Sequence, residues 1–88
     1  MIVVSIDGGC AGVKQVKDGI IGATAQQYPV KMAELGVQAI VDLINKGAKP
    51  TTSPGLDFYN TGVALVTDAP QTGVDSIDTT KASGICWG

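Results

Sequence analysis

The sequence predicts an α/β fold in which three strands alternate with two helices in the order β-α-β-α-β. Residues Met1–Ile6 form a mostly β-branched apolar run, interrupted only by Ser5, which is typical of a strand buried on both faces of a parallel sheet. Residues Pro29–Asn45 repeat apolar side chains at helical spacing. Because the connections between these elements are short, the alternation favours a layered α/β sheet.

The first half of the chain supplies two strands and a short helix. Two glycines at positions 8 and 9 end the first run, and a helix is predicted from about Cys10 to Lys17. Gly19 follows this helix and is suited to end it, since glycine readily adopts the left-handed conformation. A second strand is predicted over Ile20–Ala25, where small residues favour close approach of the backbone.

The second half begins with the strongest helix signal in the chain. Pro29 suits the first turn of this helix, and Gly47 follows it as a stop signal. Residues Lys46–Gly55 form an expected loop, and a third strand is predicted within Asp57–Thr67. The remaining residues, 68–88, are mostly polar and are expected to add little to the core.

Composition excludes several classes of protein. The chain has 88 residues and a net charge of −2, and it contains no His. Its six cationic residues are scattered lysines without a basic stripe, so nucleic acid is not an expected partner. No apolar run reaches the roughly 18 residues of a membrane span, and no secretory leader is recognisable. Three strands and two helices cannot cover both faces of a buried parallel sheet, which indicates a segment of a larger α/β protein.

Two polar residues follow neighbouring predicted strands. Asp7 ends the first strand, and Gln27 follows the second. Ligands of open α/β sheets bind beyond the carboxyl ends of the strands. A carboxylate only accepts hydrogen bonds, whereas an amide donates and accepts, so the pair would suit a neutral polyhydroxy ligand. The alternative is that Asp7 only caps the next helix and Gln27 is an ordinary surface residue.

A series of short motifs runs in order along nearly the whole chain. They are Asp7-Gly8, Asp18-Gly19, Ala23-Thr24-Ala25-Gln26-Gln27, Pro29, Met32-Ala33-Glu34-Leu35-Gly36, Thr61–Pro70 and Gly84-Ile85-Cys86-Trp87-Gly88. In this order and spacing they resemble the C-terminal third of the periplasmic sugar-binding proteins of ABC importers, the type I or ribose-binding-like family. The closing motif resembles that of a fructose-binding subgroup.

The resemblance implies a partial Rossmann-like segment that contains pieces of two lobes. Residues 1–27 and about 61–88 would belong to the C-terminal lobe, and about 28–60 would supply a helix of the other lobe and the crossovers. Asp7 and Gln27 would bind sugar hydroxyls, with Gln26 as the second choice for the amide. The implied hinge residues are Tyr28, Pro29, Tyr59, Asn60 and Thr61.

The resemblance also implies the ligand and the partners of the parent protein. These are a monosaccharide, with fructose as a candidate, and the ABC permease of the inner membrane, which places the parent in the periplasm. The arginines and most aromatics that grip sugar in this family lie in earlier parts of its chain. We therefore expect this chain alone to bind sugar poorly, and to complete its fold by oligomerisation or strand exchange with a second copy.

The same sequence is compatible with other functions. The effector domain of a LacI-type, sugar-responsive repressor shares the fold and is the nearest alternative, and a purely structural fragment is another. Catalysis is not expected, because Cys10 has no His to serve as its base. The glycines after Asp7 do not form a phosphate-binding motif. The acids of the tail lack calcium-loop spacing, so neither a metal nor a cofactor is expected.

The two cysteines, Cys10 and Cys86, lie near opposite ends of the chain. Their number is compatible with one disulfide in an oxidising compartment or with two buried thiols. We favour a disulfide that pins the tail to the first loop. Trp87, beside it, is expected to pack against the lobe, although an aromatic ring there could also stack on a sugar.

Overall fold

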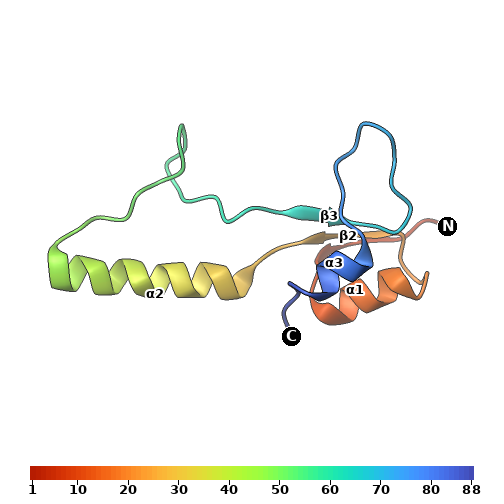
Figure 1. The fold of residues 1–88 in the computed structure, drawn as a ribbon, viewed down its shortest axis with the longest axis horizontal. Helices are drawn as coiled ribbons and strands as arrows, with labels where there is room; N and C mark the ends of the chain where they lie inside the picture. Colours follow the sequence, from red (N-terminus) through yellow and green to blue (C-terminus); the bar gives the residue numbers. More distant parts are fainter. The chain divides into compact units, whose positions relative to one another are not determined.

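A computed structural model describes all residues from 1 to 88 and contains three strands and three helices (Figure 1). The protein is a small mixed α/β chain, as the sequence predicts at that level. The elements in chain order are β1 (Val4–Asp7), α1 (Cys10–Lys17), β2 (Ala23–Gln26), α2 (Pro29–Lys46), β3 (Ala64–Val66) and α3 (Thr79–Ser83).

The strands form one sheet in the order β1-β2-β3. β1 and β2 are parallel, with Asp7 opposite Gln26. β3 is antiparallel to β2, so the prediction of a parallel sheet holds only for the first pair. The reason lies in the register, since Ala64 at the start of β3 pairs with Gln26 at the end of β2. A strand that starts beside the end of its neighbour must run back along it.

β1 does not have the double burial that its apolar sequence predicts. It is an edge strand rather than a central one, and residues 1–3 lie outside it. Val4 and Ile6 are 69% and 72% exposed. Helices cover only one face of this sheet, so side chains that alternate along β1 are covered on one side alone.

The core lies between the sheet and helices α1 and α3, which lie on the same side of the strands (Figure 1). Val13 of α1, Val66 of β3 and Ala82 of α3 form the buried cluster. Thr24 and Gln26 of β2 are also buried on this side. Strand alternation places only apolar residues on the other face, namely Val4, Ile6, Ala23, Ala25 and Leu65.

Helix α3 is absent from the sequence-based prediction, which left residues 68–88 as a polar tail. Asp78 caps its N-terminus by accepting a hydrogen bond from the Lys81 amide. The Asp68 carboxylate accepts two further bonds, from the backbone N and the Oγ1 of Thr79, at 2.8 and 2.7 Å. These bonds hold the pKa of Asp68 below its usual value. Polar capping residues, rather than apolar periodicity, therefore define this helix.

The chain divides into two compact units, residues 1–28 with 63–88 and residues 29–62. The second unit contains α2 and the irregular segment that follows it. No residue of α2 is buried, and Val37, Ile40 and Ile44 are among its exposed apolar side chains. None of the helices combines the length and the apolar character needed to cross a membrane.

Candidate functional site

Asp7 and Gln27 lie together at the carboxyl ends of β1 and β2. The side-chain amide of Gln27 donates to Asp7 Oδ1 at 3.1 Å, and its backbone N–H donates to the Asp7 carbonyl, also at 3.1 Å. Asp7 is exposed and Gln27 is half-buried. The second carboxylate oxygen of Asp7 and the amide oxygen of Gln27 make no hydrogen bond within the chain. The pair can therefore both accept and donate toward solvent.

The backbone at Asp7 has an uncommon conformation. Asp7 has a φ of 89°, and it is the only residue other than glycine with a positive φ. Gly8 follows with a φ of 59°. A Cβ on Gly8 would lie 2.4 Å from the Cα of Gln26, so only glycine fits here. This tight turn ends β1 and directs the chain into α1.

Gln26 has a different role from its neighbour. Its side chain is completely buried, and its Nε2 donates to the carbonyls of Gly8 and Ala82 at 3.1 and 3.3 Å. Its Oε1 is buried without a hydrogen-bond partner. Alternation along β2 places Gln26 on the same face as Thr24, toward the helices. Its bond to the Ala82 carbonyl joins the sheet to α3. Gln26 has no exposed surface for a ligand, which leaves Gln27 as the candidate amide.

The C-terminal residues lie against the loop that carries Asp7. Cys10 and Cys86 form a disulfide with a Cα–Cα distance of 5.1 Å, which is the pairing favoured from the sequence. The Cys10 amide donates to the Trp87 carbonyl at 2.8 Å, and the indole Nε1 of Trp87 donates to the Asp7 carbonyl at 3.3 Å. Trp87 does pack against this unit, but no sequence signal indicated its bond to Asp7.

The predicted hinge residues lie where the chain passes between its two units. Tyr28 ends one stretch of the first unit and Pro29 begins the second unit. Tyr59, Asn60 and Thr61 come shortly before the chain leaves the second unit at Gly62. The Asn60 side chain accepts a bond from the Gly62 amide at 2.9 Å, an Asx turn that shapes this segment.

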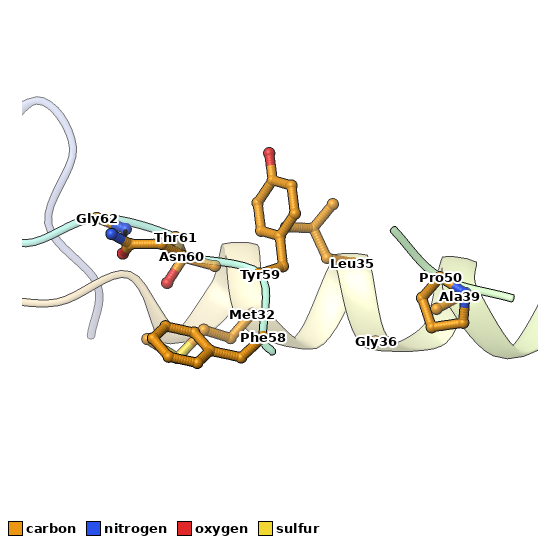
Figure 2. A pocket seen from close by; sticks show the side chains of 10 residues that line it. All are labelled: Met32, Leu35, Gly36, Ala39, Pro50, Phe58, Tyr59, Asn60, Thr61 and Gly62. Atoms are coloured by element: carbon orange, nitrogen blue, oxygen red, sulfur yellow. Dashed lines mark hydrogen bonds between the residues drawn. The ribbon is translucent and has the colours of Figure 1, made fainter. Parts of the chain in front are cut away.

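Within the second unit, three of these residues line a hollow of about 470 Å³ on α2 (Figure 2). The Phe58 ring lies by Met32, and the Tyr59 ring lies near Leu35 with its hydroxyl pointing away from the helix. The lining is mostly apolar. The hollow is therefore unsuited to a ligand rich in hydroxyls, and the rings of Phe58 and Tyr59 remain 55% and 52% exposed.

The chain offers no cluster of three His, Cys, Asp or Glu side chains that could hold a metal ion. Comparison of the chain with protein-family models, curated proteins and solved structures gave no match. The functional assignment therefore rests on the Asp7–Gln27 pair and on the order of the sequence motifs.

Proposed function

We propose that this chain is a C-terminal segment of the monosaccharide-binding component of an ABC sugar importer. Asp7 and Gln27 would form one wall of its sugar site. The observation that carries the proposal is the 3.1 Å hydrogen bond between the two side chains at the ends of parallel strands. The free oxygens of both side chains leave the pair able to bind hydroxyl groups.

The chemistry of this pair matches a neutral sugar better than a charged ligand. Each sugar hydroxyl is both a donor and an acceptor, and it needs partners of both kinds. The Asp7 carboxylate would accept from hydroxyls in charge-assisted bonds, typically about 1.5–3 kcal/mol each. The bond from Gln27 orients both side chains before a ligand arrives, which lowers the entropic cost of binding.

The chain contains no arginine, whereas the resemblance implies arginines and aromatics on the opposite wall of the site. One wall alone supports few hydrogen bonds. We therefore expect the isolated chain to bind monosaccharides only at millimolar concentrations or above, where the standard free energy of binding is about −4 kcal/mol or weaker.

The disulfide between Cys10 and Cys86 supports an exported protein over the cytosolic repressor. Disulfides persist in oxidising compartments such as the bacterial periplasm, and they are rare in the cytosol. We accordingly propose a periplasmic parent protein that delivers its monosaccharide, with fructose as a candidate, to an inner-membrane permease.

NMR titration of the isotope-labelled chain with D-fructose and D-ribose tests the proposal. We expect the side-chain amide signals of Gln27 to shift in a saturable way. Gln38 provides an internal control, because its amide donates to the Asp42 carboxylate at 2.9 Å in a second Gln–Asp pair, which lies on α2. Asp7→Asn should abolish the shift at Gln27, whereas Asp42→Asn should not.

Two results of this titration would contradict the proposal. The first is an unchanged Gln27 signal up to high sugar concentration. The second is an equal shift of Gln27 and Gln38, which would indicate a general effect of the cosolute on exposed Gln–Asp pairs.

A further inference from the structure

We infer that Trp87 is a positioning residue that holds Asp7 in its ligand-binding conformation. This inference rests on the proposed role of the Asp7–Gln27 pair. It assigns to the C-terminal segment a function within the site rather than only a structural one.

The conformation of Asp7 requires support from its surroundings. Its φ of 89° lies in a region that side-chain-bearing residues rarely adopt. Such conformations persist where neighbouring groups hold them in place. The Asp7 carbonyl accepts two hydrogen bonds, from the Gln27 backbone N at 3.1 Å and from the Trp87 Nε1 at 3.3 Å. The indole therefore holds the peptide group that follows Asp7, and in this way restrains the backbone from which the Asp7 side chain extends.

Trp87 is itself held at three points, so its bond to Asp7 has a defined geometry. Its carbonyl accepts from the Cys10 amide at 2.8 Å. The adjacent Cys86 is bonded covalently to Cys10. A Cβ on Gly9 would lie 3.5 Å from two carbons of the indole ring, which shows that the ring lies directly on the Gly9 backbone.

The same loop has a second support besides Trp87. Gln26 donates to the Gly8 carbonyl from within the core, and this bond does not involve Trp87. Loss of the indole donor should therefore alter the conformation of Asp7 without unfolding the unit. Phe preserves an aromatic ring but carries no hydrogen-bond donor.

The test uses the full chain with Trp87→Phe, and with Ile85→Ala as a matched control in the same tail. Ile85 is 48% exposed, and its aliphatic side chain has no hydrogen-bond donor. Two readouts are compared: hydrogen exchange of the Gln27 backbone amide without sugar, and the D-fructose affinity from the NMR titration. For Trp87→Phe we expect faster exchange of the Gln27 backbone amide. We also expect fructose to bind about fivefold more weakly, which is the usual effect of losing one neutral hydrogen bond. Signals of the core residues Val13 and Val66 should not move.

The two readouts separate this inference from the proposed function. Faster exchange at Gln27 in Trp87→Phe, in a protein that does not bind fructose at all, would support the positioning role and overturn the sugar site. Unchanged exchange and unchanged affinity in Trp87→Phe would overturn the positioning role, whatever the wild-type affinity. An equal effect of Ile85→Ala would overturn it as well, because that variant retains the indole donor.

Discussion

The Gln26 side chain donates to the carbonyl of Gly8 across the end of the sheet, and Gly8 has no room for a side chain of its own. The two residues form a tight contact between β2 and the loop after β1. This contact places the backbone of that loop, and so determines where Asp7 lies relative to Gln27.

Gly8→Ala should destabilise the protein strongly. The new Cβ would lie 2.4 Å from the Gln26 Cα, and the residue would keep a φ of 59°. The conformational strain and the clash together should cost about 2–4 kcal/mol. Gly12→Ala is the matched control, because its Cβ would meet no atom within 4 Å and alanine favours the α1 helix. Urea unfolding of both variants measures the difference, and equal stabilities would contradict this account.

Gln26→Ala should cost more stability than Gln27→Ala. Gln26 is fully buried, and its truncation leaves a cavity and removes the donor of the Gly8 carbonyl, while the Ala82 carbonyl keeps its bond from the Ile85 amide. We expect a loss of about 2–4 kcal/mol. Gln27 is half-buried, so its truncation should cost under about 1 kcal/mol of stability. The same variant should weaken fructose binding. The same unfolding assay measures both variants. If Gln27→Ala is the less stable of the two, the core role given to Gln26 is wrong.

The choice between these two glutamines shows what the sequence could and could not determine. Strand alternation requires that Gln26 and Gln27 face opposite ways. It does not determine which of the two faces the core. The direction depends on Ala82 of α3, which accepts a bond from Gln26, and α3 was not predicted. A helix of five residues has too little apolar periodicity to be recognised, and only its Asp78 cap gave a local signal.

Elements with strong local patterns were predicted well. Helix α1 has the expected bounds, and α2 ends one residue beyond the prediction. The exposure of β1 and the antiparallel direction of β3 were not predicted, since both depend on which strands are neighbours. The placement of Asp7 and Gln27 at neighbouring strand ends was expected, because the carboxyl ends of adjacent parallel strands meet at one edge, but the hydrogen bond between them was not predicted.

Reduction of the Cys10–Cys86 disulfide should lower the stability of the first unit substantially. The bond closes a loop with a sequence separation of 76 residues. Loops of this length correspond to roughly 4 kcal/mol in the chain-entropy model, and native disulfides typically contribute about 2–5 kcal/mol. Thermal unfolding with and without dithiothreitol, together with a thiol count, measures this. An identical transition for the oxidised and the fully reduced protein would contradict it.

The protein should lose stability in acid through Asp68. Its two hydrogen bonds from Thr79 lower the pKa of the folded state below the ordinary value of 3.8. A carboxyl with a lowered folded-state pKa contributes its full stabilisation above the ordinary pKa, and this contribution is lost as the pH falls through the folded-state pKa.

Asp68→Asn should flatten this part of the pH dependence of the unfolding free energy. Asp75→Asn, at an exposed position in the same tail, serves as the control and should leave the profile unchanged. If the profile of Asp68→Asn matches that of the wild type below pH 3.8, the Thr79 bonds are not formed in solution.

The chain should self-associate, because it leaves apolar surface uncovered in both units. One sheet face carries only apolar residues, β1 has an open edge, and the exposed residues of α2 include Ile40 and Ile44. Contiguous exposed apolar surface and unpaired strand edges both favour association. Light scattering coupled to size-exclusion chromatography should therefore give a mass above the 8.9 kDa of one chain. Ile40→Lys should shift the protein toward the monomer, while Gln38→Lys, on the polar side of α2, should not. A wild-type chain that is folded and monomeric at every concentration would show that these surfaces are stable in water without a second copy.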